Sequence, residues 1–235
     1  MRNVTILFFL TLNAFQIFAN VNDIDISKIS NDKEQFFDKK DIWIIANQGD
    51  KTTFTSRPLG ITITVNSTWY VSISDYENNR TSFVIEPSPI ANKVGIEIGY
   101  TIAIIIRTVN DNDKLEDYMG ISKYPNKKKI NLSDKYDKMI AYEIIDKTMY
   151  QDIGGGHLYM IGIERNEPKY PELLLGAPIP LPKNTDKVNY YRAVESKDRF
   201  KGKIFYLIMF DSCEDIYNQS FSIFKSLFDN EIIIE

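Results

Sequence analysis

Alternation of apolar and polar side chains with a period of two residues recurs along this chain. Residues 61–65 read Ile-Thr-Ile-Thr-Val, and residues 136–150 alternate in the same way over a longer stretch. Successive side chains of a β-strand point to opposite faces of its sheet, so this pattern predicts strands with one buried face. Short apolar runs predict further strands at 42–46, 69–73, 81–85, 157–163 and 204–210. A long strand is predicted at 95–107, and its apolar run at 104–106 predicts a centre that is buried on both faces.

Turn-forming residues separate several of these strands. Residues 47–50 (Asn-Gln-Gly-Asp) follow the first apolar run, and the glycines at 154–156 predict a hairpin that joins 136–150 to 157–163. The polar residues 110–113 are suited to cap a short helix over 114–119. Pro125 and the lysines at 127–129 predict a solvated loop.

The end of the chain predicts an amphipathic helix. Ser212 is a candidate N-cap, and Glu214 and Asp215 in the first turn favour the helix dipole. Apolar residues then recur at spacings of three and four, which gives one apolar stripe that we expect to pack on a sheet: Tyr217, Phe221, Phe224, Leu227 and Phe228. The predicted class is therefore α+β, with a central, mostly antiparallel sheet flanked by helices.

The first nineteen residues have the pattern of a secretory signal peptide. Met1 and Arg2 precede an apolar run that closes on Ala19, a small residue suited to cleavage. We therefore predict a signal peptide over 1–19, a linker or loose helix over 20–40, and a single α+β domain over 41–235. Residues 165–186 contain five prolines and predict an inserted loop within that domain.

The cysteine content and the net charge limit which compartments and which classes of partner are possible for this chain. Cys213 is the only cysteine, so an intramolecular disulfide is excluded, and a periplasmic protein is favoured over a secreted animal domain. Four Asn-x-Ser/Thr sequons beyond residue 19, at Asn66, Asn79, Asn131 and Asn218, leave glycosylation open. A net charge of -4 argues against nucleic acid as a partner. The sequence contains no second long apolar segment, so we predict no stable membrane anchor after cleavage of the signal peptide.

The order of these parts resembles the PsbP-like superfamily, which includes the extrinsic photosystem II protein and the DcrB-like exported bacterial proteins. The resemblance lies in the strand at 60–63, the short turn into Trp69, the strand at 204–210 and the helix tail at 221–227. It implies an α/β/α sandwich and a binding or assembly role. The group shares no active site, so it implies no catalytic residues here.

No motif in the chain carries the geometry of a catalytic site. His157 is the only histidine, follows a glycine turn, and is interpreted as a structural or surface residue. One histidine and one cysteine cannot supply a usual zinc site, so no metal or cofactor is predicted. Cys213 lies at the start of the last helix, where a dipole would lower its pKa, although an inert buried thiol is the simpler interpretation. The acidic residues at 111–117 are interpreted as a solvated helix start.

The proline-rich insertion is the best candidate for a contact site, because exposed apolar loops tend to bind partners. An alternative is that its leucines fold back over the sheet. The candidate partner-binding residues are Tyr170, Leu173, Leu174, Leu175, Pro178, Ile179 and Leu181. We expect an exported, non-enzymatic domain that binds a protein partner in envelope assembly or maintenance. The alternatives are an exported hydrolase with scattered acidic and tyrosine residues, and a carrier that uses Tyr70, Tyr142 and Tyr159.

Overall fold

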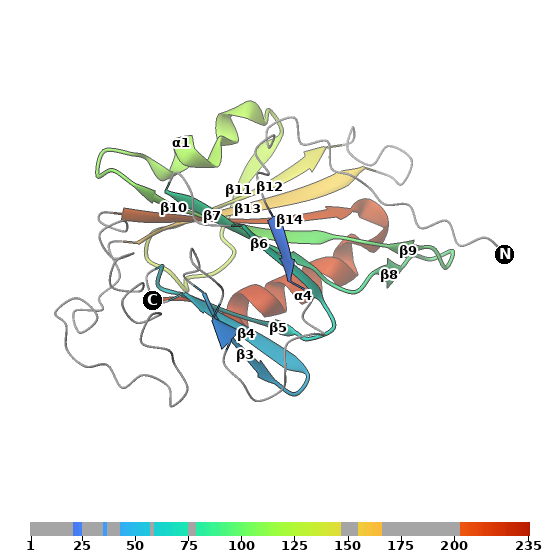
Figure 1. Cartoon of the computed structure of the whole chain (residues 1–235). Coiled ribbons are helices and arrows are strands. Elements are labelled where there is room, and N and C mark those ends of the chain that lie inside the picture. The colour runs from blue at the N-terminus through green and yellow to red at the C-terminus, as the bar shows by residue number, and fades with distance from the viewer. Residues whose placement is uncertain are drawn as a thin grey trace.

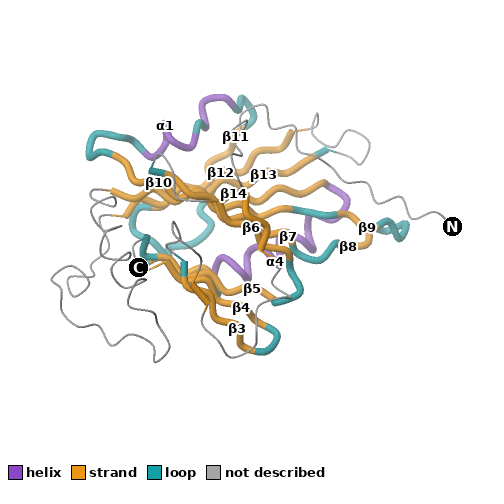
Figure 2. Tube along the Cα trace, viewed as in Figure 1, coloured by secondary structure: helices purple, strands orange, loops and turns teal. Residues whose placement is uncertain are grey.

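The computed structural model describes residues 21–24, 35–36, 43–56, 59–74, 79–146, 155–165 and 203–235. Within these residues the chain forms antiparallel sheets of eight, five and two strands, two α-helices and two 3₁₀ turns. Figures 1 and 2 show the two larger sheets as separate layers, with the longer helix, α4, beside the smaller sheet. The predicted α+β class is confirmed at this level.

The larger sheet is buried on both faces at its centre. Ile104 and Ile106 face one hydrophobic cluster, whereas Ile105 between them faces another. The strand at 204–210 divides in the same way, and an uninterrupted apolar sequence is typical of a strand that is buried on both faces. In spatial order the strands are β1 (Val21–Ile24), β6 (Tyr70–Ser74), β7 (Arg80–Glu86), β10 (Thr101–Val109), β14 (Lys203–Cys213), β13 (Gly156–Arg165), β12 (Met139–Asp146) and β11 (Lys127–Ile130).

The smaller sheet has one buried face, as the alternation at 61–65 predicted. Ile61, Ile63 and Val65 are buried. Thr64 is on the opposite face, where its hydroxyl hydrogen-bonds that of Thr53 at 3.1 Å. In spatial order the strands are β15 (Ile232–Ile234), β5 (Ile61–Asn66), β4 (Lys51–Ser56), β3 (Ile44–Gln48) and β2 (Gln35–Phe36). The predicted turn after β3 is present, and Gly49 adopts a φ of 66° there.

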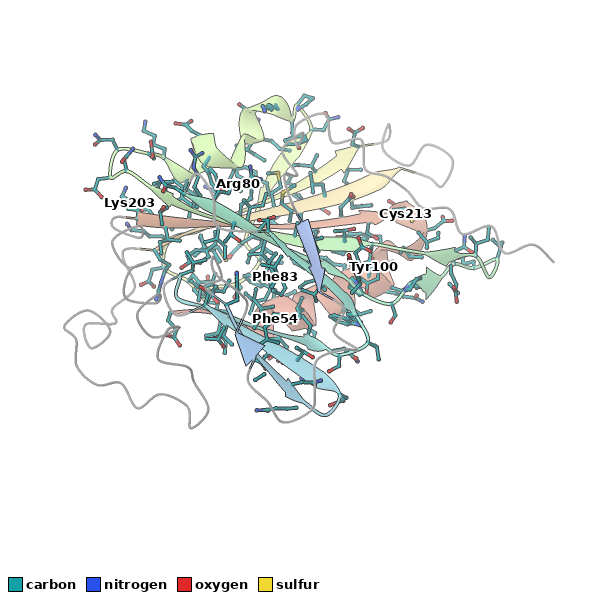
Figure 3. All side chains as sticks on the ribbon, viewed as in Figure 1. Phe54, Arg80, Phe83, Tyr100, Lys203 and Cys213 are labelled. Carbon is teal, nitrogen blue, oxygen red and sulfur yellow. The ribbon has the colours of Figure 1, made fainter. Side chains whose placement is uncertain are left out.

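The main hydrophobic core lies between the two sheets. Phe54 of β4 and Phe83 of β7 meet there edge to face, with ring centroids 4.9 Å apart (Figure 3). Trp43 packs on the same Phe83 ring at 5.4 Å. Aromatic pairs in this geometry add to the stabilisation from burial alone, so these rings join the two layers directly.

Helix α4 (Tyr217–Asn230) completes this core and follows a 3₁₀ turn, η4 (Glu214–Ile216). Phe224 stacks on Phe210 of β14 with centroids 4.7 Å apart, and Leu227 and Phe228 are also buried. The predicted apolar stripe therefore packs on the sheet. After the helix, β15 pairs with β5.

The other face of the larger sheet is covered by short elements. Helix α1 (Leu115–Met119) and the 3₁₀ turn η2 (Ile121–Lys123) place Leu115, Met119 and Ile121 over it. Gly162 of β13 allows this close approach, because a Cβ atom there would lie 2.5 Å from the Met119 sulfur. The helix predicted over 114–119 is confirmed.

This arrangement corrects the predicted α/β/α sandwich. One face of the larger sheet packs on a second sheet and α4, and α1, on the other face, has only five residues. The second sheet exists because the turn at Gly49 folds 44–56 into a hairpin, to which β5 and the C-terminal β15 then pair. The PsbP-like architecture was therefore wrong.

Local predictions were wrong in four places. The lysines at 127–129 form edge strand β11, since an exposed edge tolerates charged side chains. Ser212 is in β14 and caps no helix, because that strand continues to Cys213. The segment 95–107 is split between β9 (Glu97–Ile98) and β10. Within the predicted linker, β1 and β2 are strands that pair with β6 and β3.

Candidate functional site

The sequence-predicted contact residues lie outside the part of the chain that the structure describes, which stops at Arg165 and resumes at Lys203. These residues are Tyr170, Leu173, Leu174, Leu175, Pro178, Ile179 and Leu181. The predicted signal peptide also lies outside it. In the described residues, no helix is both long enough and apolar enough to cross a membrane.

The histidine lies in a buried polar cluster beside α4. His157 is the second residue of β13, and its ring stacks on Tyr217 with centroids 3.8 Å apart and planes 18° apart. Its Nε2 atom hydrogen-bonds Oε2 of Glu214 in η4. Its Nδ1 atom is buried without a hydrogen-bond partner and faces Oε1 of Glu143 in β12 at 3.9 Å. The imidazole is thus held between two carboxylates.

Two tyrosines extend this cluster. The Tyr159 hydroxyl donates to Glu143 Oε1 at 2.9 Å, and the Tyr217 hydroxyl donates to the Tyr159 hydroxyl at 2.7 Å. Burial, together with these bonds to Tyr217 and Glu143, raises the pKa of Tyr159. Both phenols therefore keep their protons at neutral pH. We call these five residues, Glu143, His157, Tyr159, Glu214 and Tyr217, the His157 network.

The His157 network does not have the contacts of a nucleophilic triad. Ser212 is directly opposite His157 in the sheet, but its hydroxyl hydrogen-bonds Ser220 at 2.7 Å. Only 6% of His157 is exposed, and the stacked ring leaves its edges facing glutamates. The structural interpretation of His157 is favoured, although the ring is buried rather than at the surface. In the described part of the chain, no group of three His, Cys, Asp or Glu side chains could hold a metal ion.

The thiol of Cys213 is not activated. Cys213 is buried, and this burial raises the pKa of its thiol despite hydrogen bonds from the start of the following turn. The possibility of a dipole-activated thiol was therefore wrong, and the inert interpretation is supported.

The acidic residues at 111–117 are solvated, as predicted. Asp111, Asp113, Glu116 and Asp117 are all exposed. Asp113 accepts a hydrogen bond from the Asn110 amide at 2.9 Å and so closes the loop before α1. The helix N-cap itself is Lys114, without a side-chain bond.

The three tyrosines proposed for a carrier cavity are not gathered on one side. Tyr142 packs in the cluster beneath α1, and Tyr159 is in the core on the opposite face of the sheet. Tyr70 is 40% exposed. A shared aromatic cavity built from these three residues is therefore excluded.

A two-stranded hairpin carries the most exposed apolar residues in the described part of the chain. It consists of β8 (Ile90–Ala91) and β9, and Figure 1 shows it extending beyond the end of the larger sheet. At its tip, Val94 is 76% exposed and Ile96 is 55% exposed. Large apolar side chains on a projecting tip are a common feature of contact surfaces.

The hairpin tip has a fixed backbone. Asn92 Oδ1 accepts hydrogen bonds from the amides of Val94 and Ile96 at 3.1 and 2.9 Å. Gly95 adopts a φ of 81°, which suits glycine, and its amide bonds the Asn92 carbonyl at 3.0 Å. Sequence reasoning missed this tip, although Asn92 and Gly95 were signals of a turn.

The hairpin and the His157 network meet at η4. Asn92 Nδ2 donates to Oδ2 of Asp215 at 3.2 Å, and Asp215 follows Glu214 directly. The Glu214 amide also donates to the Gly155 carbonyl at 3.0 Å. The 3₁₀ turn is therefore tied to the hairpin on one side and to the start of β13 on the other.

Comparison of this chain with protein-family models, with curated proteins and with solved structures finds no match. The resemblance to the PsbP-like superfamily, apart from its architecture, stays a prediction.

Proposed function

We propose that this protein is an exported, non-enzymatic domain that binds a protein partner, and that the β8–β9 hairpin lies in its contact surface. The observation that carries this proposal is the exposure of Val94 and Ile96 on a projecting tip. Interface energy concentrates in a few large side chains that enter pockets of the partner. These two side chains would fit an apolar pocket on the surface of another protein.

The fixed backbone of the tip supports this proposal. Four hydrogen bonds centred on Asn92 hold the turn: two to its side-chain oxygen and two through its backbone. A loop that is already ordered loses little conformational entropy when it binds, so more of the contact energy appears as affinity.

Export is supported by the sequence alone, through the signal-peptide pattern of residues 1–19. An envelope assembly or maintenance role fits an exported chain with one cysteine. The proline-rich insertion at 165–186 remains a second candidate for the contact surface, since proline segments bind at low entropic cost.

The test is capture of a partner from an envelope extract with the mature chain, residues 20–235. The wild type is compared with a Val94→Ser/Ile96→Ser variant, a deletion of residues 170–182, and Ile233→Ser as a control. Ile233 is 47% exposed on β15, so it matches the loss of an exposed apolar side chain elsewhere. The captured protein is then purified and its Kd is measured against each variant.

Full burial of an aliphatic side chain contributes roughly 1.5–3 kcal/mol, and these two are already partly covered. The double variant should therefore lose about 2–4 kcal/mol, or roughly 30- to 1000-fold in Kd. The control should stay within about threefold of wild type. Equal binding by the double variant would exclude the hairpin, and loss only in the deletion would assign the surface to the insertion.

A further inference from the structure

We infer that Arg80 of β7, Arg107 of β10 and Tyr118 of α1 form a binding site for a phosphate group. Arg80 is the first residue of β7, and Arg107 is close to the end of β10. The β8–β9 hairpin follows the end of β7 and precedes the start of β10, so the two sites lie at opposite ends of these strands. The inference goes beyond the proposed function and does not depend on it.

The two arginines lie side by side on one face of the larger sheet. Arg80 and Arg107 are directly opposite each other in the antiparallel pairing of β7 with β10. Residues in such positions have Cα atoms about 4.5–5.5 Å apart and point to the same face. Figure 3 shows Arg80 and Lys203 toward the same end of the sheet, on the side where α1 lies. Like charges in this arrangement repel each other, so an anion bound between them would stabilise the pair.

Arg107 carries a charge that no carboxylate of the described residues neutralises. It is exposed, and its side chain forms no ion pair within the part of the chain that the structure describes. Lys203, at the same end of the sheet, lies instead 3.6 Å from the carboxylate of Glu164. Arg80 has a further interaction of its own. A guanidinium has five N–H donors, so Arg80 can still bind a second acceptor.

Tyr118 places a hydroxyl donor beside both arginines. The guanidinium carbon of Arg107 lies 5.9 Å from the centroid of the Tyr118 ring, and this ring packs on Phe205 at 5.7 Å. Burial raises the pKa of Tyr118 to about 12, although the charges of Arg80 and Arg107 lower it, so both charges act at the hydroxyl, which stays protonated at neutral pH. This hydroxyl is buried and has no hydrogen-bond partner among the described residues. An anion held by the arginines would supply the acceptor that it lacks.

These donors match a phosphate group better than a carboxylate. Two guanidiniums carry two positive charges, and a phosphate monoester carries a charge of about -1.5 to -2 at pH 7 with three acceptor oxygens. Each arginine can bind phosphate oxygens through two parallel N–H groups, and the phenol can donate to a remaining oxygen. A carboxylate has one negative charge and two oxygens, so it would leave one of the three donors without an acceptor.

The test titrates inorganic phosphate into the mature chain at about pH 7.5, with chloride holding the ionic strength constant. The Nε–Hε NMR signals of the arginines report binding. We expect the Arg80 and Arg107 signals to shift along one saturable curve. The Arg165 signal is an internal control and should stay in place, since its Nε already donates to the Glu235 carbonyl at 3.0 Å. Acetate under the same conditions should bind at least about tenfold more weakly, because it matches one charge fewer.

Two variants separate binding from folding. Tyr118→Phe removes only a hydroxyl without a partner, so its melting temperature should equal or exceed that of wild type. Its Kd for phosphate should nevertheless rise about tenfold, because a hydrogen bond to a charged acceptor is lost. Arg107→Gln should weaken binding at least as much. Lys128→Gln removes an exposed charge from β11 and is the control, which should stay within about threefold of wild type.

A second ligand distinguishes the sources of the phosphate group. If glycerol 3-phosphate binds as tightly as inorganic phosphate, the site accepts the phosphate group of an organic molecule. If the inorganic ion alone binds, the ligand is free phosphate.

Three results would overturn the inference: arginine signals that do not shift, a shift that acetate reproduces at the same concentration, or wild-type affinity in Tyr118→Phe. All three concern residues remote in sequence from Val94 and Ile96. Unchanged partner binding in Val94→Ser/Ile96→Ser would refute the proposed function and leave the phosphate site standing, and a failed titration would do the reverse.

Discussion

Replacement of Lys135 by methionine should destabilise the domain by about 2 kcal/mol. The ammonium of Lys135 donates to the carbonyls of Phe228, Asp229 and Ile232 at 2.8, 3.0 and 2.6 Å. Two of these belong to the last turn of α4, where carbonyl groups have no partner within the helix. One side chain therefore closes the C-terminus of α4 and fixes the start of β15.

The magnitude follows from opposing contributions. Hydrogen bonds from a charged donor contribute roughly 1.5–3 kcal/mol, and a cation at a helix C-terminus contributes about 0.3–2 kcal/mol. The ammonium also lies about 5.5 Å from the Phe228 ring centroid, within cation–π range. Partial burial lowers the pKa of Lys135, since the charged form loses water, and this cost offsets part of the gain. Methionine keeps the stem and its packing and removes only the charge and the donors.

The assay is equilibrium denaturation with urea, together with the melting temperature. A loss of about 2 kcal/mol corresponds to a decrease in Tm of roughly 4–8 °C for a domain of this size. Lys138→Met is the matched control, because Lys138 is 59% exposed and, among the described residues, its ammonium bonds the carboxylate of Glu164. Such exposed pairs contribute about 0–1 kcal/mol. Equal effects of the two substitutions, or a Lys135→Met variant within 0.5 kcal/mol of wild type, would refute the capping role.

Three further predictions test the packing and the chemistry of the core. Gly162→Ala should cost roughly 1–3 kcal/mol in denaturation, because its Cβ would lie 2.5 Å from the Met119 sulfur, whereas Gly99→Ala, with open space, should be neutral within about 0.5 kcal/mol. The Cys213 thiol should react with a disulfide reagent at pH 8 only as fast as the domain unfolds, since the thiol is buried and its pKa is raised; rapid labelling of the folded protein would contradict this. Burial raises the pKa of Tyr100 and Tyr118 to about 12, above the ordinary value near 10. The stability that these two neutral phenols contribute is therefore complete below pH 10 and is lost between about pH 10 and 12. Absorbance at 295 nm should show that these phenols ionise at a higher pH than free tyrosine.

Sequence reasoning succeeded where one physical signal dominated. Residues 61–65 alternate cleanly, and the structure buries Ile61, Ile63 and Val65 as the period of two requires. The stripe along α4 also packs as its spacing predicted. In contrast, β4 carries one large apolar residue, Phe54, between buried Thr52 and Ser56. A strand whose buried face is half polar gives no apolar run to detect.

The His157 network could not be predicted from the sequence, because its members come from four different elements. Glu143 and Tyr159 are directly opposite each other across β12 and β13, which only the strand register determines. Glu214 and Tyr217 reach them because β14 ends beside the start of β13. Glutamate and tyrosine are common on solvated strands, so none of these residues is distinctive alone. Only the pairing of three strands makes them neighbours.

The hairpin shows why apolar sequence is an incomplete guide to burial. Ile96 and Ile98 belong to the stretch 95–107, which was predicted as one long strand. Ile98 is indeed buried, whereas Ile96 is 55% exposed, because no element covers it among the described residues. Apolar side chains are buried only where the topology supplies a second layer. The exposure of Val94 and Ile96 on an ordered turn is the observation on which the proposed contact surface rests.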